Sequence, residues 1–470
     1  MTKPSADESK SLVERGLGIV TEVRPGEGPT ALLLTLNLFL LMAAYYILKP
    51  IRDSLIINVE GGAEYKSYMG GAIAIALLFA VPAYGWIASR LQRNRLLIGV
   101  SVFFIANLVI FYFLSLMPFT QNGRGGLLFA LGFFLWIGVF NMMIVAQFWA
   151  FANDLYDDKQ GKRLFALVGM GASLGSVAGS VLPALAEKLG TKPLFLIAAA
   201  LLGISAFLIQ VVHVRETKSG PKTASGDGET EKESKKTDTP GKDAGKDAGK
   251  GGPFGMVLRH RYLLLIAIFS AVFTLANTNG EYILGKLAKG ASASSPDAGK
   301  YLTAFYGQFY LIVNLVGLGL QTFVVSRIVK FFGFRVAFFI LPVIACADAV
   351  GIALLPILAI ARIGKIAENS VDYSLNNTLR NMLWLPTTRE EKYQAKQAVD
   401  TFFVRVGDVG SGLVVFVLIQ QLHLGVRAMA VANIVLVAVW LVVAKLIVTE
   451  NTKLTAEGAK KDESTVEPAR

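Results

Sequence analysis

The 470-residue chain is poor in the residue types that build most catalytic and metal centres. It has one cysteine, Cys346, which excludes a disulfide within the chain, and its three histidines are too scattered for a metal site. Charged residues make up only 17% of the chain, which is low for a soluble domain. No Ser–His, Cys–His or metal-ligand grouping stands out. The sequence therefore predicts neither an enzyme nor a bound cofactor.

Hydrophobic residues, in contrast, make up 53% of the chain and form runs of about 20 residues or more. Such runs can cross a hydrocarbon core roughly 30 Å thick. The net charge of +12 comes mostly from loops and tails, without the aromatic–basic interleaving of a nucleic-acid binder. We therefore expect an all-α membrane protein with twelve transmembrane helices, at about 31–58, 68–89, 96–117, 126–151, 163–187, 192–213, 262–285, 300–325, 334–356, 357–385, 397–421 and 426–449.

Four basic loops on one side of this topology predict its orientation. They are "RLQRNR" (90–95), "DDKQGKR" (157–163), "SRIVKFFGFR" (326–335) and "TTREEKYQAK" (387–396). Because basic loops stay in the cytoplasm, we expect cytoplasmic tails at 1–30 and 450–470. Residues 1–28 are polar, so no cleavable signal peptide is expected. The predicted location is the cell (inner) membrane, crossed many times.

A polar tract divides the chain into two similar halves. Residues 214–258 include "GETEKESKKTDTPGKDAGKDAGKGG" and predict a disordered cytoplasmic linker, which either tethers the halves or serves a partner. "YIL" at 46–48 recurs at 282–284, and "SR" at 89–90 recurs at 326–327. We expect two pseudo-symmetric six-helix bundles, 31–213 and 259–449. This arrangement resembles the major facilitator architecture, in which the binding site lies between the halves.

Ionisable side chains inside these spans are costly and mark candidate sites. On the tenth span Arg362, Lys365, Glu368, Asp372 and Asn376 fall in one sector of roughly 120° on an ideal helix. Arg405 and Asp408 are three residues apart on the eleventh span. These groups either form charge pairs that lock helices together or line a water-filled path.

The first span carries Lys49, Arg52 and Asp53 on one face, next to Pro50. They indicate a cavity or gate, unless Lys49 snorkels to the headgroups. Asn141 either lines the same cavity or bonds a neighbouring helix. Asp348, alone in the ninth span, has no interpretation from sequence. Gly171, Gly175 and Gly179 form a small-residue face that predicts close helix packing.

The predicted site gathers the polar residues that face the space between the halves. It comprises Lys49, Arg52, Asn141, Glu281, Lys365, Glu368, Asp372, Asn376, Arg405 and Asp408.

Three segments resemble the ATP/ADP translocase family, the nucleotide transport proteins of plastids and energy-parasitic bacteria. They are "ILKPIRDSLII" in the first span, "FWAFANDLYDDKQGKRLFALVGMGAS" (148–173) and "YSLNNTLRNMLWLPTTREEKYQAKQAVD" (373–400). The resemblance implies a major facilitator fold and nucleotide exchange.

The family's functional residues match only in part. The first-helix lysine falls at Arg52 and the seventh-helix glutamate at Glu281, whereas the fourth-helix glutamate has no counterpart. Asp408, in "GDVGSG", replaces a family lysine, and so does Asp372.

Balanced charge leaves the solute open. Six candidate cations face six candidate acids, which fits a zwitterion, a weakly charged anion or proton coupling, whereas a nucleotide site should carry excess positive charge. We expect a secondary transporter working by alternating access, with a small-molecule solute and the lipid bilayer as partners and no nucleic acid. The alternatives are a proton-coupled carrier of a non-nucleotide solute and a transport fold acting as a membrane sensor or assembly partner.

Overall fold

The first half of the chain folds into a bundle of long helices in the computed structural model, which describes residues 21, 23–24, 26–90, 93–121, 123–156, 158–218 and 252–466. Helix α7 (Ala186–Leu189) and the 3₁₀ turn Pro118–Thr120 lie at one end of this bundle. The long helices are α2 (Gly28–Asn58), α3 (Gly62–Ala88), α4 (Arg93–Leu116), α5 (Gly123–Leu155), α6 (Asp158–Ala184) and α8 (Lys192–Lys218).

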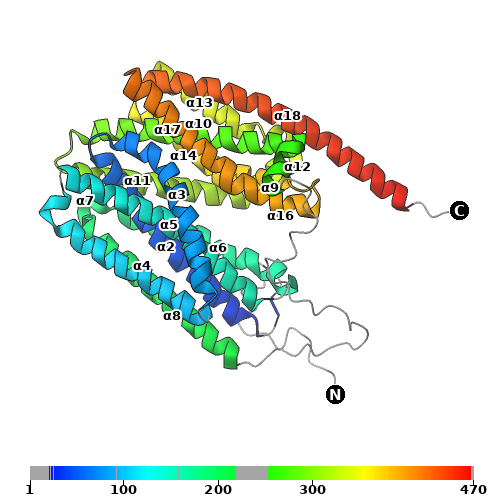
Figure 1. Cartoon of the computed structure of the whole chain (residues 1–470), viewed down its shortest axis with the longest axis horizontal. Helices are drawn as coiled ribbons and strands as arrows, with labels where there is room; N and C mark the ends of the chain where they lie inside the picture. Colours follow the sequence, from blue (N-terminus) through cyan, green and yellow to red (C-terminus); the bar gives the residue numbers. More distant parts are fainter. Residues whose placement is uncertain are drawn as a thin grey trace.

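The second half forms another helical bundle beside the first (Figure 1). Four π-helical segments interrupt it: Leu320–Val324, Asp372–Asn376, Val399–Phe403 and Phe416–Gln421. Its α-helices are α9 (Gly252–Arg259), α10 (Arg261–Ser292), α11 (Ala298–Gly319), α12 (Val325–Ala337), α13 (Ile340–Leu354), α14 (Leu358–Val371), α15 (Asn377–Met382), α16 (Arg389–Ala398), α17 (Val404–Val415) and α18 (Val426–Val466).

The all-helical membrane fold is confirmed. Among the described residues, 10 helical stretches are long and apolar enough to cross a membrane. One of them, Ala298–Leu354, has 57 residues, more than twice the length of about 20 residues that one crossing needs. It contains a backbone break at Gly333 (φ 71°). The polar tenth span is not among the 10 stretches. The number of twelve crossings therefore stays a prediction.

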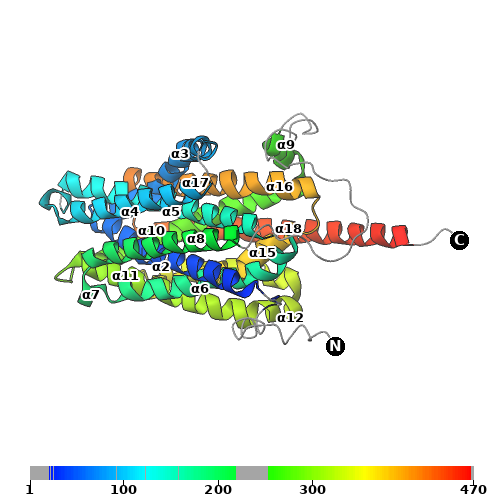
Figure 2. The same ribbon diagram turned by 90° about the horizontal axis from the view of Figure 1, so that it is seen from below.

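The start of α2 and the end of α18 lie at the same end of the molecule, opposite α7 (Figures 1 and 2). We call these two ends the terminal end and the α7 end. Helix α8 runs to Lys218 and α9 occupies Gly252–Arg259, so the borders of the predicted linker 214–258 are helical. Its middle, 219–251, lies outside the described residues. Helix α18 likewise continues through most of the predicted tail 450–470.

Helix α2 packs closely against α6 through the predicted glycine face. A Cβ atom added at Gly171, Gly175 or Gly179 would overlap the α2 backbone at Thr35, Phe39 and Ala43, respectively. Only glycine permits two backbones to approach this closely. The predicted packing role of these glycines is confirmed.

The start of α2 is also fixed to the start of α6. The Glu27 carboxylate accepts hydrogen bonds from Arg163 (3.0 Å), Gln160 (3.1 Å) and the backbone N–H of Arg24 (3.0 Å). Burial alone would raise the pKa of Glu27, but these bonds to its ionised form outweigh burial and hold that pKa below its ordinary value. Glu27 is therefore a charged anchor at the terminal end.

The two bundles meet through an apolar cluster that draws on both. Ile56 and Ile57 of α2 and Met69 of α3 pack with Tyr282 of α10 and Tyr306 of α11. A Cβ at Gly307 of α11 would overlap the α6 backbone at Pro183 and Ala184. These contacts bring α2, α3, α10, α11 and α17 around one central region, where the polar residues of the spans gather.

Candidate functional site

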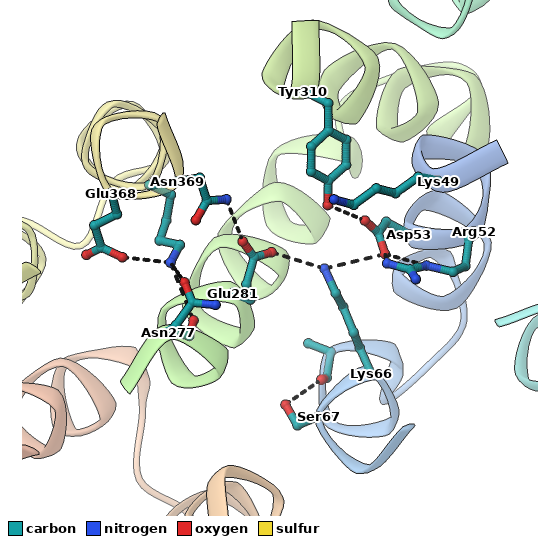
Figure 3. Close-up of polar contacts among 12 residues, drawn as sticks. Lys49, Arg52, Asp53, Lys66, Ser67, Asn277, Glu281, Tyr310, Glu368 and Asn369 are labelled. Atoms are coloured by element: carbon teal, nitrogen blue, oxygen red, sulfur yellow. Dashed lines mark hydrogen bonds and ion pairs between the residues drawn. The ribbon is translucent and has the colours of Figure 1, made fainter. Parts of the chain in front are cut away.

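Lys66 connects the two bundles at the centre of the molecule (Figure 3). Its Nζ lies 3.6 Å from Asp53 Oδ1 on α2 and 3.3 Å from Glu281 Oε2 on α10. Asp53 is fully buried and also binds Arg52 (3.0 Å) and the hydroxyl of Tyr310 on α11 (2.6 Å). One ammonium group thus bridges acids from both halves.

Lys49 points inward among aromatic rings. Its Nζ lies 4.0 Å from the ring centroid of Tyr310 and 5.2 Å from that of Tyr46, and it donates to the hydroxyl of Tyr373 at 3.4 Å. Only 9% of Lys49 is exposed. Cation–π contacts and the tyrosine hydroxyl stabilise the buried charge. The side chain does not snorkel to the membrane surface, which removes that alternative.

The second bundle supplies further pairs. Glu281 accepts from Asn369 at 3.2 Å, while Lys365 donates to Glu368 and to Asn277, both at 2.7 Å (Figure 3 labels these partners). On α17, Arg405 donates to Asp408 at 2.8 Å. Asp408 also accepts from Thr278 of α10 at 3.2 Å. Glu281, Glu368 and Asp408 therefore each accept at least one hydrogen bond.

A central cavity of about 240 Å³ lies between the bundles, and we keep this name for it. Six predicted site residues line it: Lys49, Arg52, Glu281, Asp372, Arg405 and Asp408. Its other lining residues are Lys66, Ser67, Gly70, Ile73, Phe134, Asn277, Thr278, Tyr282, Tyr310, Asn369 and Tyr373.

The remaining four predicted residues lie elsewhere. Lys365 (0% exposed) and Glu368 (7% exposed) are buried inside the second bundle, and Asn376 donates to Asp372 at 2.7 Å. The predicted polar stripe therefore does not face the central cavity along its whole length, because Asp372 is its only member in the described lining. Asn141 lies seven residues, about two turns, beyond Phe134, the only α5 residue in the described lining.

Sequence reasoning missed Lys66 and the aromatic lining. The second span was expected to begin at 68, yet α3 begins at Gly62, so Lys66 lies within the helix. The sequence offered one signal for this residue, which is the position of Lys66 four residues before the glycine pair Gly70–Gly71. Tyr310 and Tyr373 gave no signal, since tyrosines in apolar helices are common packing residues.

Positive and negative charges around the central cavity balance. Four cations line it, Lys49, Arg52, Lys66 and Arg405, together with three acids, Glu281, Asp372 and Asp408. A fourth acid, the buried Asp53, pairs with Arg52 and Lys66. Arg52 also lies over the ring of Phe134, at 4.3 Å. This arrangement suits an anion that displaces the acids from their cations.

Two helical bundles that enclose a charged cavity at their interface define the class of membrane carriers. The chain belongs to the Major Facilitator Superfamily, which it matches over residues 30–366. Residues 347–451 also match the TLC ATP/ADP transporter family. This match confirms the resemblance of the tenth-to-eleventh segment (373–400) to that family.

Curated relatives and solved structures agree with this assignment. The chain is 22% identical to ADP,ATP carrier protein 1 of Chlamydia trachomatis serovar D, over 92% of this chain and 90% of the relative. It is 25% identical to ADP,ATP carrier protein 5 of Rickettsia bellii, over 60% of this chain and 59% of the relative. The fold matches a POT family transporter in complex with 5-aminolevulinic acid (TM-score 0.58, 15% identity, 95% and 98% coverage). It also matches the nucleoside transporter NupG (TM-score 0.59, 12% identity, 89% and 98% coverage).

Proposed function

We propose that this protein is a secondary transporter that exchanges adenine nucleotides across a cell membrane by alternating access. The observation that carries the proposal is the central cavity, where four cations from both bundles meet at the interface. The relatives named as ADP,ATP carriers point to the same solute class. The solute crosses unchanged, so the protein performs no enzymatic step.

The ion pairs of the central cavity give a mechanism for binding. In the present state Arg405 is paired with Asp408 and Lys66 with Glu281. Phosphate oxygens replace these carboxylates as partners, and arginine can bind two of them at once. Tyr373 lines the cavity and is 42% exposed, which offers an aromatic face to the base.

The α7 end is closed by bonds between the bundles. Lys286 of α10 pairs with Glu64 of α3 at 2.6 Å, Lys289 donates to the Asn58 side chain at 3.1 Å, and Ser54 donates to the Gly299 carbonyl at 2.9 Å. A volume of about 240 Å³ is below the roughly 300–1,000 Å³ of drug-sized ligand sites. Binding a nucleotide therefore requires the bundles to separate. We place the terminal end in the cytoplasm, as the basic loops suggest.

Exchange can be tested in vesicles that contain the purified protein and unlabelled ATP. Labelled ATP outside should accumulate faster than in vesicles without internal nucleotide. Arg52→Ala and Arg405→Ala should each lower this uptake at least tenfold, whereas Arg95→Ala, an exposed residue outside the cavity, should not. Absence of uptake with ATP, ADP and the other nucleoside triphosphates would exclude nucleotide exchange.

A further inference from the structure

A second cavity lies at the α7 end, and we call it the α7-end cavity. Its volume is about 550 Å³, compared with about 240 Å³ for the central cavity, and falls in the range of small-molecule sites. Its walls come from α2, α5 and α8 of the first bundle and from the start of α11 in the second. Helix α2 presents Ile51, Ser54 and Leu55 to it, whereas Lys49 and Arg52 of the same helix line the central cavity. Helix α2 therefore lies between the two cavities.

Part of the lining of the α7-end cavity is apolar. Ile51, Phe129 and Phe195 contribute to it and are buried in the first bundle. Leu55 and Val59 of α2 are half-buried and extend the same lining. Aliphatic and aromatic side chains of this kind bind the apolar body of a ligand, while a few polar groups fix its orientation.

The polar part of the lining carries two lysines and one acid. Lys300 pairs with Asp297 at 3.5 Å. Lys192 begins α8, and no described residue forms an ion pair or a hydrogen bond with its side chain. An unpaired ammonium group at the N-terminus of a long helix, where the helix dipole also favours negative charge, suits an acidic group of a ligand.

The α7-end cavity crosses the interface between the bundles, and its lining includes residues that close the α7 end. Ser54 of the first bundle donates to the Gly299 carbonyl of the second at 2.9 Å, and both residues line the cavity. Asn58, also in the lining, accepts from Lys289 at 3.1 Å. Opening of the α7 end would move the two walls of this cavity apart. A ligand that contacts both walls therefore binds the closed arrangement and shifts the population towards it.

We propose that the α7-end cavity binds an organic anion, with its apolar body against Phe129 and Phe195 and its acidic group at Lys192, and that this ligand holds the α7 end closed. A soluble organic phosphate and an anionic phospholipid both have this chemistry. The ligand inhibits and is not itself carried, because α2 lies between its cavity and the central one. The binding site stands on its own geometry, whereas the inhibition of exchange rests on the proposed function.

Thermal unfolding of the purified full-length protein tests the binding site, with 1-naphthyl phosphate as the soluble probe. The probe should raise the unfolding temperature of the wild type at concentrations at which inorganic phosphate, which lacks an apolar body, does not. Lys192→Ala should weaken the apparent affinity about tenfold, the value of one charge-assisted hydrogen bond, and Lys192→Glu should abolish the effect. Lys188→Ala, at an exposed position outside the lining, and Arg405→Ala, in the central cavity, should bind the probe as the wild type does.

The same measurement in nanodiscs separates the two sources of the ligand. If a phospholipid occupies the site, phosphatidylglycerol added to phosphatidylcholine should stabilise the wild type and not Lys192→Glu. If a soluble anion occupies it, only 1-naphthyl phosphate should have this Lys192-dependent effect. Stabilisation by neither probe would overturn the proposal, as would equal stabilisation of the wild type and Lys192→Glu.

Exchange in vesicles tests the inhibition. With 1-naphthyl phosphate on both sides of the membrane, wild-type exchange of labelled ATP should slow several-fold, and saturating external ATP should not restore it, because every cycle passes through the closed α7 end. Lys192→Glu should exchange ATP at the wild-type rate and resist the probe. Inhibition that external ATP fully overcomes would place the probe in the central cavity and reject the inhibitory role. Lys192-dependent stabilisation of a protein that moves no nucleotide would leave the binding site intact and reject the proposed function.

Discussion

At the scale of single residues, the central cavity is built from charges that are already neutralised. Lys66 shows this best, because it lies between Asp53 of its own bundle and Glu281 of the other. Such a network keeps charged side chains stable in a membrane interior. It also leaves them ready to change partners when an anion enters.

Replacing Lys66 should affect both stability and transport. Lys66→Ala leaves Asp53 and Glu281 buried with one cation fewer, and losing one partner of a buried pair costs about 3 kcal/mol. We expect a lower unfolding temperature in detergent and at least a tenfold loss of nucleotide uptake, with partial recovery in Lys66→Arg. Lys188→Ala, at an exposed position on α7, is the control. Wild-type uptake by Lys66→Ala would show that Lys66 plays no part in binding.

Glu27 predicts a pH dependence at the terminal end. Its folded-state pKa lies below the ordinary value of 4.5, so its stabilisation is complete above pH 4.5 and is lost as the pH falls through the folded pKa. Glu27→Gln should therefore cost about 1 kcal/mol at pH 7 and nothing well below pH 4. Unfolding temperatures of both proteins between pH 3 and 7 measure this. A difference that stays constant over that range would contradict it.

Lys66 marks the limit of what the sequence predicts for single residues. Its partners lie on two other helices, and no spacing along the chain reveals such partners. Lys49, Arg52, Arg405 and Asp408 were recognisable because ionisable groups within apolar runs are rare. Their pairing with Asp53, Thr278 and tyrosines required the folded structure.

At the scale of elements, hydrophobic runs predicted the helices well and their local geometry poorly. Helix α2 begins three residues before the expected span and ends with it at Asn58. The π-helical segments at Asp372–Asn376 and Val399–Phe403 were not foreseen. A prediction from hydrophobic periodicity assumes that the helix turns by the same angle at every residue. A π-helical segment changes that angle locally. Lys365 and Glu368, on the regular helix before Asp372, are buried in the bundle interior and are not among the residues that line the central cavity.

The glycine face of α6 gives a prediction for packing between elements. Gly175→Ala places a methyl group against the Phe39 carbonyl of α2 and should destabilise the protein by about 1–3 kcal/mol. Gly169→Ala is a matched control on the same helix, because an added Cβ there meets no atom within 4 Å. Thermal unfolding in detergent compares the two. Equal stability of both variants would show that α2 and α6 separate without cost.

At the scale of the whole molecule, the two bundles are bonded to each other at the α7 end and through Lys66 at the centre, an arrangement suited to rocking about a central site. The bonds at the α7 end connect α2 and α3 to α10 and the start of α11. Alternating access requires these bonds to break in each cycle.

Cross-linking tests this movement. In a Cys346→Ala background, a bifunctional methanethiosulfonate reagent should link Asn58→Cys to Lys289→Cys across the α7 end and stop exchange until a reductant is added. Asn381→Cys with Lys396→Cys joins two residues that are hydrogen-bonded within the second bundle and should leave exchange intact. Full exchange by the cross-linked first pair would argue against opening at the α7 end.

Helix α18 extends past the other helices at the terminal end (Figure 1). Its 41 residues make a rod of about 60 Å at 1.5 Å per residue, roughly twice the thickness of a hydrocarbon core. A globular protein fused in register to this rod would be held clear of a detergent micelle at a defined angle. Electron cryo-microscopy would gain an external landmark for particle alignment, which small polytopic proteins lack.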